Sequence, residues 1–263
     1  MPTVISNGIR IYFEERGNGD PLILLMGLGT PGSRWVDHVA SYEKYFRCIL
    51  VDNRGAGGSD KPNGPYTTRI MADDTAGLML ALGIENARVA GISMGSAIAQ
   101  ELALSYPKLV RSLVLISSWS RCDRYTQNVF EHFKRIRKTS SPGEFTQLIQ
   151  LWIASAAYYN EHFDNMVQDQ TKTQDDYMPI HAFQAQCDAC GMHDTFSRLD
   201  KITVPTLLTV GDADIFTPLR LTVEMNEKMP NSKMEVFNGL GHIHHWEDLE
   251  RFNYVTTQFL SEN

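Results

Sequence analysis

The stretch Ala90-Gly91-Ile92-Ser93-Met94-Gly95-Ser96 predicts a β-strand that turns sharply into a helix, which continues over residues 97–104. Gly-x-Ser-x-Gly at such a junction is a nucleophile elbow, a tight turn that exposes a serine hydroxyl at the edge of a sheet. The two glycines are needed because side chains there would collide with the turning backbone. Taken alone, the motif also fits an ordinary strand-to-helix turn. Ser93 is therefore a candidate nucleophile whose partners must be sought elsewhere in the chain.

Largely apolar runs on both sides of this stretch predict further strands that are buried on both faces. They lie at residues 22–26, 46–51, 110–117 and 204–210, and helical patterns such as residues 67–82 lie between them. Strands that alternate with helices are typical of a mostly parallel sheet that helices cover on both faces. A chain of 263 residues is long enough for one α/β domain of this kind with an insertion.

The strand pattern is interrupted at residues 119–197. Helical patterns occupy residues 121–138, 142–157, 163–172 and 176–193, and aromatic residues are frequent among them. We expect residues 119–197 to form an inserted helical cap, a lid over the C-terminal edge of the sheet. The core would then consist of residues 1–118 and 198–263, and it would end in a helix over residues 246–260.

Composition narrows the possible partners and compartment. The net charge of −7 leaves no surplus of basic residues for a nucleic acid. We expect no membrane association, since no apolar run is long enough to cross a bilayer, and the first residues lack the features of a signal peptide. Cys187 and Cys190 form a lone Cys-x-x-Cys, which indicates two thiols on a helix rather than a redox or zinc site. We expect a cytoplasmic monomer or homodimer without a cofactor or metal.

A serine nucleophile needs a base, and the base needs an acid that orients it. Asp214 follows the predicted strand at 204–210, and His242 follows another predicted strand at 233–237. Both loops leave the sheet at the edge where the elbow lies. The order Ser93, Asp214, His242 therefore predicts a catalytic triad.

Neighbouring residues offer alternatives to both partners of the serine. Asp212 competes with Asp214, but the first residue of a turn more often closes the loop. His244 and His245 compete with His242, and together the three histidines could suggest a metal site. No acidic or cysteine ligands cluster with them in the sequence, so we favour the triad.

These motifs together resemble the α/β-hydrolases that carry a helical cap, over nearly the whole chain. The resemblance rests on residues 24–29 (Leu-Leu-Met-Gly-Leu-Gly), 52–62 (Asp-Asn-Arg-Gly-Ala-Gly-Gly-Ser-Asp-Lys-Pro), 91–96, 211–214 and 241–242. It is nearest to the branch of 3-oxoadipate enol-lactonases, aminoacrylate hydrolases and small-ester hydrolases. The resemblance implies Ser93 as nucleophile, His242 as base, Asp214 as its acid, and the amides of Leu28 and Met94 as the oxyanion hole. Many relatives have His-Gly where this chain has Met26-Gly27, so the neighbouring pocket should be more apolar.

The function expected from these residues is metal-free hydrolysis of a small-molecule carboxylic ester or lactone through an acyl-enzyme. Met26, Trp119 and Trp152 are the candidates for the substrate pocket. Two alternatives on the same fold stay open: hydrolysis of a carbon–carbon bond in a diketone, and a small-ligand receptor or regulator with little turnover. Serine at the elbow, where aspartate would be needed, argues against a haloalkane dehalogenase or an epoxide hydrolase.

Overall fold

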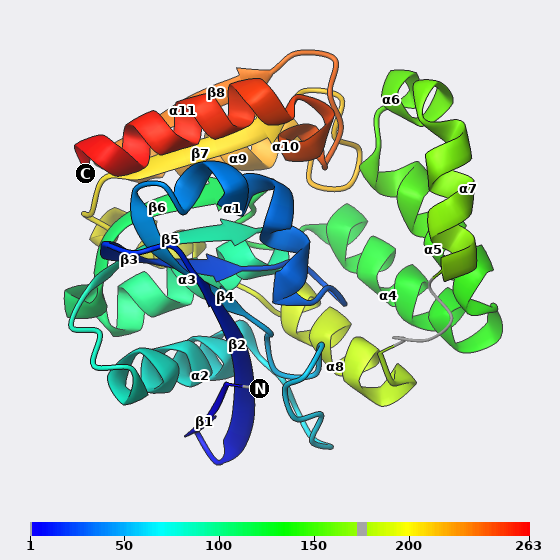
Figure 1. The fold of residues 1–263 in the computed structure, drawn as a ribbon. Coiled ribbons are helices and arrows are strands. Elements are labelled where there is room, and N and C mark those ends of the chain that lie inside the picture. The colour runs from blue at the N-terminus through cyan, green and yellow to red at the C-terminus, as the bar shows by residue number, and fades with distance from the viewer. Residues whose placement is uncertain (1, 173–177) are drawn as a thin grey trace.

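The computed structural model describes residues 2–172 and 178–263. Within these ranges, one eight-stranded sheet has the spatial order β1-β2-β4-β3-β5-β6-β7-β8 (Figure 1). Neighbours from β4 to β8 in this order are parallel, whereas β2 is antiparallel to both β1 and β4. The predicted mostly parallel α/β sheet is confirmed. Its strands are β1 (Thr3–Ser6), β2 (Ile9–Arg16), β3 (Asp20–Leu25), β4 (Phe46–Val51), β5 (Ala87–Ile92), β6 (Val110–Ile116), β7 (Thr206–Gly211) and β8 (Ser232–Phe237).

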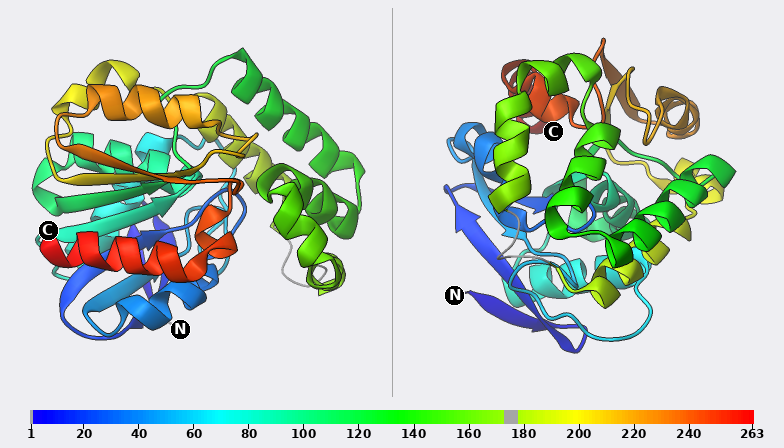
Figure 2. Two further views of the ribbon diagram at one scale, coloured as in Figure 1. Left: turned by 90° about the horizontal axis from the view of Figure 1, so that it is seen from above. Right: turned by 90° about the vertical axis from the view of Figure 1, so that its right-hand side faces the viewer.

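The apolar runs form central strands because helices cover the sheet on both faces (Figure 2). All six residues of β5 and of β7 are buried. One core cluster joins the sheet to α1 (Val36–Tyr42) and α11 (Leu249–Glu262). The other joins the opposite face to α2 (Thr68–Ala81), α3 (Met94–Ser105) and α9 (Leu219–Lys228). None of the helices in the described residues is long and apolar enough to cross a membrane.

Among the described residues, five α-helices lie between β6 and β7, beyond the C-terminal ends of the parallel strands (Figure 1). Arg121 and Asp194 form an isolated β-bridge that joins the two ends of this segment. Within the segment, α4 packs on α8 and α5 packs on α7. The helices are α4 (Arg124–Thr139), α5 (Pro142–Ile153), α6 (Ala156–Glu161), α7 (Phe163–Lys172) and α8 (Ile180–Gly191).

Two predicted helices are each divided in the structure. The helix predicted at 142–157 ends at Ile153, and Ser155 caps the separate helix α6. The break has a tertiary cause. The Ser155 amide donates to the Glu247 carboxylate at 2.8 Å, and Ile153 O accepts from the amide of Ile243 in the core. The terminal helix predicted at 246–260 divides into α10 (His244–Glu247) and α11, since Asp248 has non-helical dihedral angles and caps α11.

The helix predicted at 176–193 is shorter in the structure. It starts at Ile180 and ends at Gly191. The first two residues of the prediction, 176 and 177, lie outside the described residues. Both thiols of the Cys-x-x-Cys pair lie on this helix and are buried, and burial raises the pKa of Cys187 and of Cys190 above the ordinary value.

Candidate active site

Ser93 occupies the turn between β5 and α3 with a strained backbone, at φ 52° and ψ −116°. A side chain on either flanking glycine would destroy this turn. A Cβ on Gly91 would lie 2.3 Å from the carbonyl oxygen of Gly95, and one on Gly95 would lie 2.2 Å from that of Leu25. The amide of Ser93 donates to Ile116 O at 2.8 Å, which fixes the turn to the neighbouring strand. Such strain at a non-glycine residue persists only where the surroundings enforce it.

Asp214 and His242 form a direct hydrogen bond, with Oδ2 of the carboxylate 2.8 Å from Nδ1 of the imidazole. Both side chains are buried. The carboxylate is oriented by its own loop, because its Oδ1 accepts from the amides of Phe216 and Thr217 at 2.7 and 2.9 Å. The Thr217 hydroxyl adds a bond of 2.8 Å to Oδ2. A carboxylate held in this way can fix the tautomer and orientation of the imidazole.

The sheet brings His242 to the edge where Ser93 lies. Ile92 pairs with Ile116 in the parallel register, so Ser93 and Ser117 follow the ends of adjacent strands. The Ser117 hydroxyl then donates to the backbone carbonyl of His242 at 2.6 Å. No hydrogen bond joins the hydroxyl of Ser93 to His242 among the described residues. Catalytic hydrogen bonds are often long without substrate and shorten in its complex.

The competing residues have other structural roles. Asp212 accepts from the amide of Gly239 at 2.5 Å and thereby closes its loop. His244 lies between the hydroxyls of Thr209 and Ser117, and burial lowers its pKa to about 3. Nδ1 of His245 lies 3.1 Å from Nε2 of His38, a buried histidine in α1. Within residues 2–172 and 178–263, no group of three His, Cys, Asp or Glu side chains is arranged to hold a metal ion.

The amides of Leu28 and Met94 are both available to a ligand. Neither has a hydrogen-bond acceptor in the described part of the chain. Met94 begins α3, where the first amides of a helix are unpaired and favour negative charge. The loop that carries Leu28 touches the elbow, since a Cβ on Gly27 would lie 3.4 Å from Cβ and 4.0 Å from Oγ of Ser93. Two free amides beside one serine can stabilise an oxyanion.

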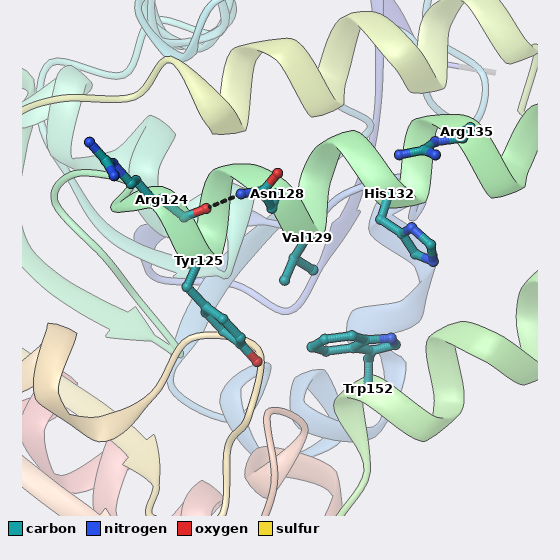
Figure 3. Close-up of a pocket in the computed structure, with 7 residues that line it drawn as sticks. All are labelled: Arg124, Tyr125, Asn128, Val129, His132, Arg135 and Trp152. Carbon is teal, nitrogen blue, oxygen red and sulfur yellow. Dashed lines mark hydrogen bonds between the residues drawn. The ribbon is translucent and has the colours of Figure 1, made fainter.

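The three expected pocket residues occupy different environments. Met26 is buried in the core cluster on the α1 side of the sheet. Trp119 is 0% exposed and packs against Phe130 and His193. Trp152 is half-buried and borders a surface groove of about 520 Å³ between α4 and α5 (Figure 3). Trp119 belongs to the core cluster on the opposite face and Trp152 packs against that cluster, so the structure separates Met26 from the two tryptophans.

A chain of packed aromatic rings leads from Trp152, at the border of the groove, to the imidazole of His242. Trp152 packs edge-on against Phe133 at 5.9 Å between ring centroids, Phe133 packs against Phe216 at 5.3 Å, and Phe216 packs against His242 at 4.8 Å. Tyr125 lines the same groove and donates to Ile215 O at 2.6 Å (Figure 3).

Sequence reasoning did not identify Phe216 and Thr217 as neighbours of the base. The Asp214 side chain accepts from the backbone amides of the residues two and three positions later in the chain, which is the pattern of an Asx turn. Asp-x-x-Thr after a strand was therefore a usable signal for Thr217. Nothing local in the sequence indicates that the ring of Phe216 lies against His242.

Known proteins resemble this chain over almost its whole length. Residues 20–249 match the family model described as alpha/beta hydrolase fold. The proposed carbamate hydrolase RutD from Azorhizobium caulinodans is 31% identical over 269 positions, which cover 100% of this chain and 99% of RutD. The proposed non-heme bromoperoxidase BpoC from Mycobacterium tuberculosis is 30% identical, over 96% of this chain and 98% of BpoC. The solved structure of an esterase from Thermogutta terrifontis superposes on this chain with a TM-score of 0.87 and 25% sequence identity. The match covers 99% of this chain and 96% of the esterase.

Proposed function

The chain belongs to the α/β-hydrolase family, and we propose that it is a serine hydrolase of a carboxylic ester or lactone. The observation that carries this proposal is the 2.8 Å bond between Asp214 and His242 at the sheet edge that also bears the strained Ser93. Its catalytic residues would be Ser93, His242 and Asp214, with the amides of Leu28 and Met94 as the oxyanion hole.

In the proposed reaction, the Ser93 hydroxyl attacks the carbonyl carbon while Nε2 of His242 takes its proton. Asp214 holds the imidazole through Nδ1 and offsets the positive charge that forms on it. The carbonyl oxygen becomes an oxyanion, which the amides of Leu28 and Met94 stabilise. The tetrahedral intermediate collapses, the bond to the leaving oxygen breaks, and His242 returns the proton to that oxygen. Water then attacks the acyl-enzyme by the same steps and releases the acid.

We further propose that residues 119–197 act as a lid on the core formed by residues 1–118 and 198–263. Two observations support a lid. The helices lie beyond the C-terminal ends of the parallel strands (Figure 2). In addition, Phe133 of α4 packs against Phe216, whose ring lies beside the imidazole of His242, and Trp152 of α5 packs on Phe133. A lid in this place would exclude water and limit the size of the substrate. We propose that the groove at Trp152 accommodates part of the substrate.

A second candidate substrate is a carbamate, because RutD is the proposed carbamate hydrolase at 31% identity over the whole chain. The carbonyl group of a carbamate is open to the same attack by a serine. The two candidates differ in their products, since a carbamate ester releases an alcohol and a carbamic acid that breaks down to carbon dioxide and an amine, whereas an ester or lactone releases a carboxylic acid. Product analysis therefore separates them.

The proposal is tested with p-nitrophenyl esters of rising chain length, several lactones, a carbamate and a diketone. We expect turnover on at least one ester or lactone to continue far beyond one equivalent of product. Turnover of the diketone alone would favour carbon–carbon hydrolysis. Release of no more than one equivalent from every compound would favour a small-ligand receptor and contradict the proposed function.

A further inference from the structure

We propose that Gln186, on helix α8, positions the Leu28 amide that receives the oxyanion. The helical segment would then take part in the hydrolytic step through this side chain, besides controlling access to the site. This inference rests on the proposed function, because it assigns a role within that reaction. Gln186 would be a positioning residue, since it is 0% exposed and both the oxygen and the nitrogen of its amide group bond to backbone partners.

Gln186 fixes one end of the peptide that links Leu28 to Gly29. Its Oε1 accepts from the Gly29 amide at 2.8 Å. The other end of the same peptide is held as well, because the Thr30 hydroxyl donates to Leu28 O at 3.1 Å. Gly29 has φ +70°, a conformation that favours glycine. The preceding peptide, which carries the Leu28 amide, is held at its carbonyl, because Gly27 O accepts from the Thr30 amide at 3.4 Å. The two held peptide planes restrict the torsions of Leu28 between them, and with them the direction of its free amide.

The orientation of the Gln186 side chain is itself determined by its surroundings. Its Nε2 donates to Arg54 O at 2.8 Å, so the oxygen of the amide group must face Gly29. The guanidinium of Arg54 is held by two bonds of 2.7 Å to the buried carboxylate of Asp74. Gln186 therefore connects the loop of Leu28 to a rigid part of the core.

A second contact from the same helix limits movement of this loop. Phe183 lies one turn before Gln186, and its ring would be 3.3 Å from a Cβ placed on Gly29. Helix α8 thus contacts the loop through a hydrogen bond and through an aromatic ring. An oxyanion donor must be aimed within a few tenths of an ångström to stabilise a transition state. A change in the position of α8 would misdirect the Leu28 amide.

The test uses Gln186→Met, which keeps a similar volume but removes both hydrogen bonds. The matched control is Gln150→Met, because Gln150 is a buried glutamine of α5 whose amide group bonds to Met166 O and to the side chain of Gln170. We expect Gln186→Met to lower kcat by about 10- to 100-fold with KM within twofold, as for partial loss of one oxyanion donor. Gln150→Met should retain kcat within twofold.

Binding of a trifluoromethyl ketone separates positioning from a general loss of structure. This inhibitor binds as an oxyanion adduct, so its affinity should fall in Gln186→Met by the same factor as kcat. Gln186→Glu keeps an acceptor for the Gly29 amide, and we expect it to recover part of both losses. If Gln186→Met does not fold, the same two measurements on Gln186→Glu and on Thr30→Val, which frees the other end of the peptide, decide the question.

The outcomes distinguish this inference from the proposed function. A wild-type protein that hydrolyses no ester, lactone or carbamate would overturn both. An active wild-type protein with unchanged kcat in Gln186→Met would overturn the positioning role alone. The same holds if kcat falls while the affinity for the trifluoromethyl ketone is unchanged, or if Gln150→Met loses as much activity as Gln186→Met.

Discussion

Oδ2 of Asp214 lies 2.8 Å from Nδ1 of His242, although the two residues are separated by 28 positions and follow different strands. The bond exists because β7 and β8 are parallel neighbours whose C-terminal ends meet at one edge. Asp212 lies only two positions from Asp214, and its carboxylate bonds instead to the amide of Gly239. The two aspartates therefore form a matched pair for testing the role of the acid.

Asp214→Asn should keep the fold and lower kcat about 10³- to 10⁴-fold, because the amide would hold the imidazole in the wrong tautomer. Asp212→Asn should lower kcat less than tenfold, since it affects only the closure of its loop. Steady-state kinetics on the best ester measures both. A larger loss in Asp212→Asn than in Asp214→Asn would show that the acid is wrongly assigned.

The elbow glycines should resist substitution by alanine. Gly91→Ala would place a Cβ 2.3 Å from a backbone oxygen, so we expect a loss of unfolding free energy of about 3 kcal/mol or more, or no folding at all. Gly191→Ala is the control, because a Cβ there meets nothing within 4 Å. Urea unfolding compares the variants. Equal stabilities for both would contradict the close packing at the elbow.

Buried histidines should make the protein less stable below neutral pH. Burial lowers the pKa of His38 to about 4 and that of His193 and His244 to about 3. Unfolding restores values near 6.5, so the unfolded state binds more protons below that pH and stability falls from pH 6.5 toward pH 4. At pH 5 each such histidine should lower the free energy of unfolding by about 2 kcal/mol.

Urea unfolding between pH 5 and 7 measures this effect. His193→Gln removes one titrating group. The number of protons taken up on unfolding near pH 5, which sets the slope of the unfolding free energy against pH, should therefore decrease by about one. The hydroxyls that bond to His193 belong to Thr68 and Thr195, away from the candidate triad. A slope unaffected by His193→Gln would mean that this residue titrates equally in both states.

Trp152 should influence the size of substrate that is accepted. Trp152→Ala enlarges the groove between α4 and α5, so kcat/KM for long acyl chains should rise relative to short ones (Figure 3). Leu151→Ala is the control, since Leu151 is exposed and does not line the groove. Equal losses on short and long p-nitrophenyl esters would indicate that Trp152 only packs within the helical segment.

The strands and the elbow were predictable because their signals are local. Apolar runs mark β3, β4 and β5, and the glycines beside Ser93 mark the turn. The contacts that complete the site depend on which distant segments meet. The bond from Gln186 to Gly29 spans 157 positions, and no local pattern indicates it.

The same limit applies to the helical segment. The break after Ile153 depends on Glu247, which accepts from the amide of Ser155 across 92 positions. Trp119 and Trp152 are equivalent as sequence signals, yet Trp119 is enclosed by aromatic neighbours and Trp152 borders a groove. Their difference in burial follows from packing between α4, α5 and the strand ends, which periodicity does not encode.

The central claim is that Ser93 is a nucleophile activated by His242. A fluorophosphonate reacts only with an activated hydroxyl, and its oxygen would occupy the site of the Leu28 and Met94 amides. Peptide mapping by mass spectrometry after labelling identifies the modified residue. We predict one adduct on Ser93 with complete loss of turnover, no adduct in Ser93→Ala, and very little in His242→Ala. An adduct on a different serine, or undiminished turnover in Ser93→Ala, would contradict the assignment of the nucleophile and the mechanism built on it.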